Sequence, residues 1–189
     1  MHRNIPNTLT WVRIALVPVF VLLYYLPWRW GHFCAAAFFS LAAITDWLDG
    51  YIARNWQLSS RFGAFLDPVA DKLMVAVALV LVVGEVPVPF LTIPAAVIVG
   101  REIIVSALRE WMAEIGKRNN VSVGMVGKIK TTCQMIALIA LLLYRADSPY
   151  ALALFGTIML YIAAALTIYS MIIYIKSAWG DLTLSPEQQ

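Results

Sequence analysis

The sequence predicts an all-α, polytopic membrane protein with six transmembrane helices and an N-terminal interfacial segment. Of its 189 residues, 61% are hydrophobic and only 13% are charged, which is the composition of a membrane protein rather than of a soluble domain. Apolar runs of roughly 20 residues recur along the chain, and a helix of that length crosses a bilayer core of about 30 Å. We expect residues 1–189 to form a single membrane domain.

The first segment combines a short polar start with a long apolar run. Residues 1–8 are expected at the membrane surface, with Pro6 and Asn7 suited to the start of a helix. The first span then runs from about Leu9 to Pro27. Because it has no small-residue cleavage signature and further spans follow, we interpret it as a retained transmembrane helix rather than a signal peptide. Arg13, one turn inside, either snorkels to the interface or faces a polar cavity.

Five further spans follow from the positions of the apolar runs. The connection 28–32 contains tryptophans that suit an interfacial belt, and His32, which has no metal-ligand companion nearby, is interpreted as an ordinary interfacial residue. The predicted spans cover about residues 33–51, 64–83, 90 to beyond 107, 131–144 and 150–175. The fifth is short unless it begins within the basic stretch before it.

Basic residues are distributed unevenly between the two sides of this topology. Twelve of the 14 Lys and Arg residues fall on the side of the termini, and only Arg29 and Arg145 fall on the other. The positive-inside rule therefore places the termini in the cytoplasm. No basic tail or aromatic-interleaved basic stripe occurs, so nucleic acid is not an expected partner. Cys34 and Cys133, far apart in apolar stretches, are expected to be buried free thiols.

Four aspartates lie in or beside apolar segments, where ionisable side chains are costly and usually functional. Asp46 and Asp49 close the second span, and Asp67 and Asp71 open the third, so both pairs lie at the same side of the membrane. Spacings of three and four residues put each pair on one helix face. Four converging carboxylates favour a hard cation, Mg²⁺ or Mn²⁺, and two such ions could bridge a diphosphate. Alternatively, these acids are helix caps and surface charges, as an aspartate before Pro68 could be.

A second group is basic and lies toward the cytoplasmic ends of the fourth and fifth spans. It comprises Arg101, Arg109, Lys128 and Lys130. Guanidinium and ammonium groups near a metal site favour a phosphorylated ligand. The alternative is that such residues anchor the chain to anionic head groups, and we prefer that interpretation for Lys117 and Arg118. Glu102 could pair with a neighbouring base.

The run from Asp46 to Asp71 reads D-x2-D-G-x2-A-R-x8-G-x3-D-x3-D, and this stretch resembles the CDP-alcohol phosphotransferase family. The resemblance implies two divalent ions, Mg²⁺ or Mn²⁺, held by Asp46, Asp49, Asp67 and Asp71. Asp71 is in addition the candidate general base for the acceptor hydroxyl. The residues expected to bind the CDP nucleotide are Asn7, Thr10, Asp49, Gly50, Ala53, Arg54 and Gly63.

Segments 6–10, 101–114 and 127–132 are similar to those of bacterial family members that use CDP-diacylglycerol as donor and sn-glycerol 3-phosphate as acceptor. This similarity covers nearly the whole chain, to about residue 175. It implies a homodimer in the bacterial inner membrane, with the active site on the cytoplasmic side. The residues expected to grip the acceptor phosphate are Arg101, Arg109, Lys128 and Lys130.

Two other functions remain open at this point. Within the family, the acceptor could be inositol phosphate, serine or phosphatidylglycerol, although a neutral acceptor would leave the basic group without a ligand. From another class, the acidic cluster could belong to a cation-transport pathway. A transporter should carry polar residues through to the far side, and the outer halves of the second and third spans have none comparable.

Overall fold

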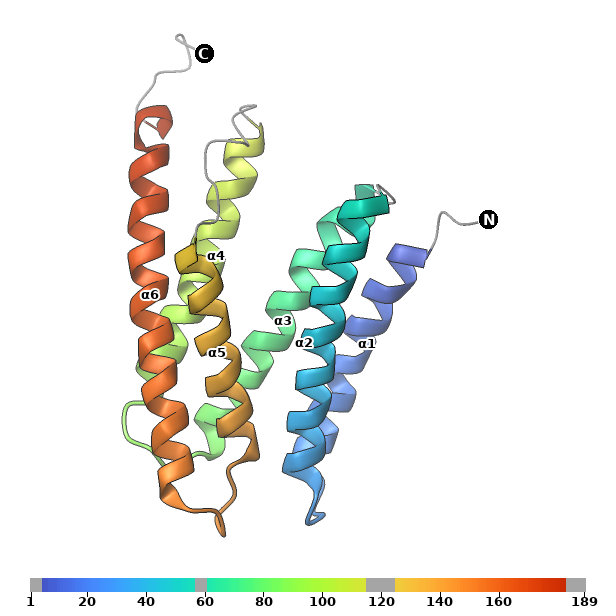
Figure 1. Cartoon of the computed structure of the whole chain (residues 1–189), viewed down its shortest axis with the longest axis vertical. Helices are drawn as coiled ribbons and strands as arrows, with labels where there is room; N and C mark the ends of the chain where they lie inside the picture. The colour runs from blue at the N-terminus through green and yellow to red at the C-terminus, as the bar shows by residue number, and fades with distance from the viewer. Residues whose placement is uncertain (1–4, 57–60, 115–124, 183–189) are drawn as a thin grey trace. The chain divides into compact units, whose positions relative to one another are not determined.

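The part of the chain that the computed structural model describes, residues 5–56, 61–114 and 125–182, forms six helices (Figure 1). Within it, side chains are not described for residues 5–13, 46–56, 61–68, 71, 113–114, 125–126 and 177–182. The helices are α1 (Ile5–Tyr25), α2 (Gly31–Trp56), α3 (Arg61–Glu85), α4 (Thr92–Glu114), α5 (Met125–Leu143) and α6 (Tyr150–Leu182).

The predicted all-α class and the six helices are confirmed, with changes at the helix ends. Helix α1 begins at Ile5, inside the segment expected at the membrane surface, and α5 begins at Met125, inside the basic stretch. The fifth apolar run was short because its first turns are polar. Among the described residues, Tyr150–Lys176 is long and apolar enough to cross a membrane, and Ile14–Tyr25 and Gly31–Thr45 are shorter apolar stretches.

The helices form two compact units. Unit 1 contains Met1–Pro87 and Leu138–Gly156, and unit 2 contains Val88–Ala137 and Thr157–Gln189. Helices α5 and α6 therefore each contribute a segment to both units. Unit 1 holds every aspartate of the acidic motif, and unit 2 holds the four basic residues.

Unit 1 is built on α1, which packs against both α2 and α3. The Phe20 side chain is fully buried, and its ring lies 6.4 Å from that of Phe38 and 6.0 Å from that of Phe39, measured between centroids. Ala70 and Ala78 on α3 are also fully buried, and small residues let helices approach closely. Aromatic rings and alanines thus supply the interlocking core.

The turn between α1 and α2 needs a glycine at its end. The Gly31 amide donates a hydrogen bond to the Trp28 carbonyl at 2.9 Å, which closes the turn. A Cβ at Gly31 would lie 2.9 Å from the Leu26 carbonyl oxygen and 3.0 Å from that of Leu23. The chain can therefore reverse direction this tightly only because residue 31 has no side chain.

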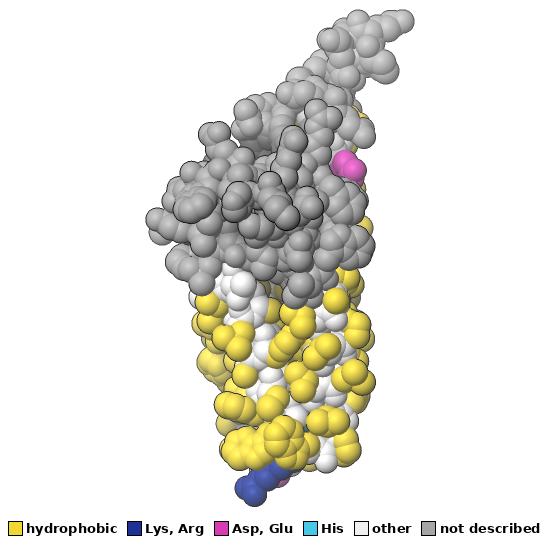
Figure 2. Space-filling model, turned by 90° about the vertical axis from the view of Figure 1, so that its right-hand side faces the viewer, with side chains coloured by type: hydrophobic (Ala, Val, Ile, Leu, Met, Phe, Trp, Pro, Cys, Tyr) yellow, Lys and Arg dark blue, Asp and Glu magenta, His cyan; other side chains and the backbone are white. Residues whose placement is uncertain are grey.

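The outer surface of α1 and α2 is apolar. Leu22, Phe33, Leu41 and Ile44 are all more than half exposed. Figure 2 shows hydrophobic side chains covering the described part of this face, with Lys or Arg side chains at its lower end. A soluble protein rarely exposes so continuous an apolar surface, so this face suits contact with lipid.

Unit 2 contains α4, the first part of α5 and most of α6. Its core includes Ile98, Ala137 and Leu160, one from each helix, and all three side chains are fully buried. The Tyr161 hydroxyl donates to the Phe90 carbonyl at 3.0 Å. Phe90 has a φ of 62°, a left-handed conformation that is uncommon for a residue with a side chain. This hydrogen bond ties the turn before α4 to α6. Cys34 and Cys133 are free, as predicted, although both are half-buried.

Candidate active site

The acidic motif divides between two neighbouring helices of unit 1. Asp46 and Asp49 lie in the C-terminal half of α2, and Asp67 and Asp71 lie in the first turns of α3. Because α2 ends at Trp56 and α3 begins at Arg61, both pairs lie toward the end of unit 1 where these helices are connected. The helical positions agree with the prediction, while the four side chains lie outside the part of the chain that the structure describes.

The residues expected to bind the nucleotide also belong to unit 1. Asn7 and Thr10 are on α1; Gly50, Ala53 and Arg54 are on α2; Gly63 is on α3. Helix α1 packs against α2 and α3, the two helices that carry the other residues of the predicted nucleotide site. The side chains of these residues, and that of Arg13, lie outside the described residues, as do Lys117 and Arg118 altogether.

The basic residues of unit 2 gather around one carboxylate. Oε1 of Glu102 accepts a hydrogen bond from Nζ of Lys130 at 2.8 Å and another from Nη1 of Arg101 at 2.9 Å. The Lys130 side chain is 7% exposed and that of Arg101 is 13% exposed. Two cations from different helices, α4 and α5, are therefore held on one oxygen in a partly dry environment. The expected pairing of Glu102 with a base is confirmed.

Arg101 also donates a hydrogen bond to α6, and one of its N–H groups has no partner among the described residues. Its Nη2 donates to the Ser170 hydroxyl at 3.3 Å, and that hydroxyl in turn donates to the Thr167 carbonyl at 2.9 Å. Its Nε is buried and finds no hydrogen-bond partner among the described residues. An unpaired buried N–H of a charged group is costly, so this donor is suited to an anionic ligand.

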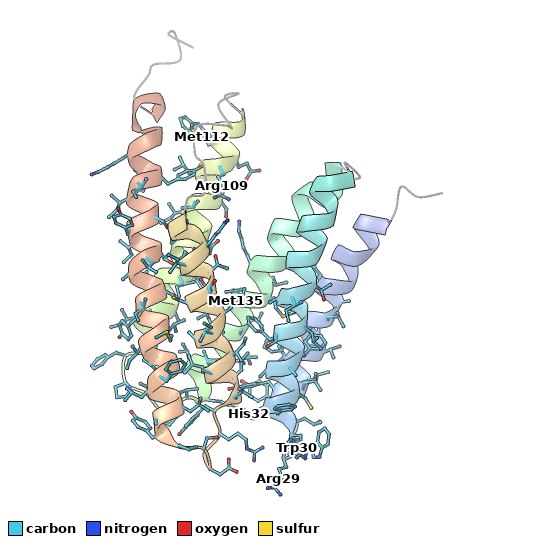
Figure 3. The ribbon with its side chains drawn as sticks, viewed as in Figure 1. Arg29, Trp30, His32, Arg109, Met112 and Met135 are labelled. Carbon is cyan, nitrogen blue, oxygen red and sulfur yellow. The ribbon has the colours of Figure 1, made fainter. Side chains whose placement is uncertain are left out.

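The remaining two basic residues differ in environment. The Arg109 guanidinium lies over the Tyr174 ring, 5.7 Å from its centroid, an arrangement that favours a cation. Arg109 is close enough to Lys130 for their charges to repel, and Figure 3 shows it on α4 near Met112. The Lys128 side chain is exposed, and the Lys128 backbone carbonyl accepts a hydrogen bond from the Thr132 hydroxyl at 3.0 Å. The structure thus brings Arg101, Arg109 and Lys130 together, although Arg109 is exposed, as Lys128 is.

Sequence reasoning missed the contribution of α6. Ser170 and Tyr174 support Arg101 and Arg109, yet both lie in a long apolar segment that showed no motif. A signal was present, because Thr167, Ser170 and Tyr174 are spaced by three and four residues and therefore share one face of a helix. Polar groups at that spacing in a membrane helix usually face a partner or a site.

Curated relatives resemble this chain over almost its full length. A CDP-diacylglycerol--glycerol-3-phosphate 3-phosphatidyltransferase of Yersinia enterocolitica is 55% identical over 182 residues, which are 96% of this chain and 98% of the relative. Proteins of the same name from Sodalis glossinidius and Escherichia coli (strain K12) are 54% and 53% identical over the same shares. Residues 3–169, which include both the acidic motif and the basic cluster, match a family pattern, and the chain belongs to the CDP-alcohol phosphatidyltransferase family.

Proposed function

We propose that this protein is a CDP-diacylglycerol--glycerol-3-phosphate 3-phosphatidyltransferase, which transfers the phosphatidyl group of CDP-diacylglycerol to sn-glycerol 3-phosphate and releases CMP. The observation that carries this proposal is the identity of 53% to 55% with enzymes of that name, spread over 96% of the chain. The basic cluster of unit 2, which consists of Arg101, Arg109 and Lys130, independently supports an acceptor that carries a phosphate.

The charge of that cluster fits a phosphate monoester. Arg101, Arg109 and Lys130 contribute three positive charges and Glu102 contributes one negative charge, which leaves two positive charges. A phosphate monoester carries between one and two negative charges near neutral pH. Glycerol 3-phosphate would therefore balance the cluster, with its oxygens accepting hydrogen bonds from the guanidinium groups. Serine, which has no phosphate, would leave two cations uncompensated.

The acidic motif of unit 1 would bind the donor. Its four aspartates form a set of hard oxygen ligands that suits Mg²⁺ or Mn²⁺, and no competing group of three or more His, Cys, Asp or Glu side chains occurs among the described residues. Bound ions would neutralise the diphosphate of CDP-diacylglycerol as it is attacked. We assign the two ions to Asp46, Asp49, Asp67 and Asp71, and the nucleotide to Asn7, Thr10, Asp49, Gly50, Ala53, Arg54 and Gly63.

In the transfer step, the acceptor hydroxyl attacks the phosphorus that bears the diacylglycerol. Asp71 accepts the hydroxyl proton, a new phosphorus–oxygen bond forms, and the bond from that phosphorus to the bridging oxygen breaks, so CMP leaves with that oxygen. Arg101, Arg109 and Lys130, with Lys128 at the rim, hold the acceptor phosphate so that its hydroxyl is oriented for attack. The chemistry requires an ionised Asp71 whose free oxygen reaches the nucleophile.

The enzyme would work at a membrane surface, because one substrate is a lipid and the other is water-soluble. The family is one of integral membrane enzymes, and the apolar segment Tyr150–Lys176 and the exposed apolar face of α1 and α2 support that placement here. We further propose that the six helices span the bacterial inner membrane, with the termini and the active site on the cytoplasmic side. We also propose that the protein is a homodimer. The distribution of Lys and Arg supports that orientation.

The decisive experiment measures CMP release from CDP-diacylglycerol by the purified protein in detergent with Mg²⁺. Glycerol 3-phosphate, inositol phosphate, serine and phosphatidylglycerol are compared as acceptors at equal concentration. We expect release that depends on glycerol 3-phosphate. Release that depends on another acceptor would keep the family chemistry and reject the proposed acceptor, whereas no release with any acceptor would reject the transferase assignment.

A further inference from the structure

Unit 1 contains a cavity of about 820 Å³ at the end opposite the acidic motif. It is formed by the connection between α1 and α2, the end of α3 and the connection between α5 and α6. His32, in the first turn of α2, is 14 residues from Asp46, a distance of roughly 21 Å along a helix. The cavity is therefore separate from the proposed catalytic site, and the transfer reaction gives it no role.

Hydrogen-bond acceptors converge on its inner part. Nδ1 of His32 lies 3.2 Å from the Leu142 carbonyl, which can only accept, so Nδ1 carries the hydrogen. In the neutral imidazole, Nε2 is then an acceptor, and it faces Oε2 of Glu85 at 3.7 Å, which is beyond hydrogen-bonding distance. The sequence indicated no metal-ligand companion for His32 and an interfacial position, and the fold places the Leu142 carbonyl and Glu85 beside its ring.

Tyr24 adds a third polar atom to the same place. Its side chain is 2% exposed, and its hydroxyl is buried beside the Glu85 carboxylate, which can accept the hydroxyl hydrogen and leave the oxygen lone pairs open. Its ring lies 4.5 Å from the His32 ring, measured between centroids. A buried hydroxyl at a cavity wall whose oxygen can still accept is suited to a ligand group that donates a hydrogen bond.

The cavity wall is rich in aromatic rings, and it carries one carboxylate, that of Glu85, and two guanidinium groups, those of Arg29 and Arg145. Tyr25, Trp28 and Tyr144 line it together with Tyr24. In the Arg145 guanidinium, Nε donates to Asp147 at 3.1 Å and Nη1 donates to the Arg29 carbonyl at 2.5 Å, so the charge of Arg145 is paired with the Asp147 carboxylate. A carboxylate among aromatic rings is the environment that attracts a cation.

We propose that this cavity binds a primary ammonium group, carried by the ethanolamine headgroup of an aminophospholipid. An ammonium has three N–H donors, and the inner cavity offers three acceptors: the Glu85 carboxylate, Nε2 of His32 and the Tyr24 hydroxyl. The ligand is a lipid rather than a free amine because Tyr25, Leu26 and Trp28, which line the opening, are about half exposed and continue the apolar outer face of α1.

The order of residues along the cavity indicates where the lipid phosphate would lie. Figure 3 shows His32 deeper in unit 1, with Trp30 and then Arg29 nearer its end. The ammonium would occupy the layer of His32, and the phosphate would lie outward, in the layer of Arg29, whose guanidinium can pair with it. In the proposed topology this end faces away from the cytoplasm, and the exposed Trp28 and Trp30 would lie at the interface.

The first test compares lipids that differ only in the headgroup. The full-length protein in detergent is titrated with phosphatidylethanolamine, phosphatidylcholine or phosphatidylglycerol of identical acyl chains, and bound lipid is counted by native mass spectrometry. Phosphatidylcholine has a quaternary ammonium without N–H donors, so we expect phosphatidylethanolamine to bind about tenfold more tightly or better. Equal binding of these two, or stronger binding of phosphatidylglycerol, would overturn the proposal.

The second test removes the acceptors one at a time. Glu85→Gln keeps the side-chain shape and Tyr24→Phe keeps the ring, and each should weaken phosphatidylethanolamine binding, the former about tenfold. Glu110→Gln, a change of an exposed carboxylate on α4, is the matched control and should bind like the wild type. Thermal unfolding in detergent, compared with the wild type, confirms that each variant is folded. Unchanged lipid binding in both cavity variants would contradict the assignment.

The third test separates the lipid from a soluble amine. Free ethanolamine and phosphoethanolamine are added as competitors at the concentration of the bound lipid. We expect neither to displace phosphatidylethanolamine, because neither has the acyl chains that contact the apolar face. Displacement at equal concentration would overturn the lipid assignment. All three readouts are lipid binding, so their failure is distinguishable from failure of the proposed transferase activity.

Discussion

The Glu102 carboxylate lies 2.8 Å from the Lys130 ammonium, and this ion pair joins α4 to α5 inside unit 2. Because the same oxygen also accepts from Arg101, one carboxylate orients two cations without cancelling their combined charge. The Lys130 side chain is almost completely buried, and a buried charge that loses its partner is strongly destabilised. Glu102 therefore orients the two cations that we propose bind the acceptor, before any substrate arrives.

Glu102→Gln should weaken acceptor binding selectively. The amide keeps the shape of the carboxylate but attracts the two cations less, so Arg101 and Lys130 are less well oriented. We expect the KM for glycerol 3-phosphate to rise about tenfold, with little change in kcat or in the KM for CDP-diacylglycerol. Steady-state CMP release measures all three values. Glu110→Gln serves as the control, and equal increases in the KM of both substrates would contradict a specific role.

Lys128 and Lys130 provide a matched pair on α5, because one is exposed and the other is buried against Glu102. Lys130→Met should raise the KM for glycerol 3-phosphate about 10- to 100-fold, through loss of a charged hydrogen bond in a dry site. Lys128→Met should raise it only a few-fold, because solvent screens an exposed charge. The acceptor dependence of CMP release measures both. Equal effects would mean that the contact with Glu102 does not distinguish these lysines.

Asp71→Asn should abolish turnover while leaving CDP-diacylglycerol binding largely intact. Asparagine cannot accept the hydroxyl proton, but it retains one oxygen ligand for a cation. CMP release and equilibrium binding of CDP-diacylglycerol are measured on the same preparation. Asp147→Asn, which changes an exposed carboxylate 74% accessible to solvent, should leave activity unchanged. A variant at Asp71 that still turns over would exclude this residue as the base.

Removal of divalent cations should stop the reaction. We expect a chelator to abolish CMP release, and added Mg²⁺ or Mn²⁺ to restore it, because the diphosphate needs its charge neutralised during attack. Asp46→Asn should increase the Mg²⁺ concentration that gives half-maximal activity, whereas Asp147→Asn should not. Full activity in the presence of excess chelator would rule out the proposed metal site.

Gly31→Ala should destabilise the protein by about 1 to 3 kcal/mol, because the added Cβ would press on the carbonyls of Leu26 and Leu23. Gly100 on α4 is the control, since a Cβ there meets nothing within 4 Å. Gly100→Ala should stabilise α4 by roughly 0.5 to 1 kcal/mol, because alanine loses less conformational entropy in a helix. Thermal unfolding in detergent measures both. A Gly31→Ala variant as stable as the wild type would refute the close approach.

Much of the fold could be predicted because the signals are local. Apolar runs separated by Gly, Pro and charged residues indicated all six helices, and the structure confirms them. Helix α1 begins at Ile5, next to the Pro6 and Asn7 that suited a helix start, and α5 begins at Met125, inside the basic stretch, which is the condition set for the short fifth run. The prediction that residues 1–189 form one membrane domain stays a prediction, and so do the roles of the four aspartates.

Other features depended on residues far apart in the chain. Lys128 and Lys130 looked equivalent in sequence, yet only Lys130 reaches Glu102, which is 28 residues away. Ser170 is 69 residues from Arg101, and Leu142 is 110 residues from His32. No local pattern encodes such pairs, because they form only when helices pack.

The sequence by itself determined the helices, the acidic motif and the family, since hydrophobic runs and fixed spacings along one chain carry that information. Only the tertiary structure decided which cations share the Glu102 carboxylate, which lysine stays in solvent, and that His32, Glu85 and Tyr24 line one cavity. The physical reason is that burial and hydrogen bonding depend on which side chains meet across helices. The identity of a residue sets what it can donate, accept or bury, and packing sets its partners.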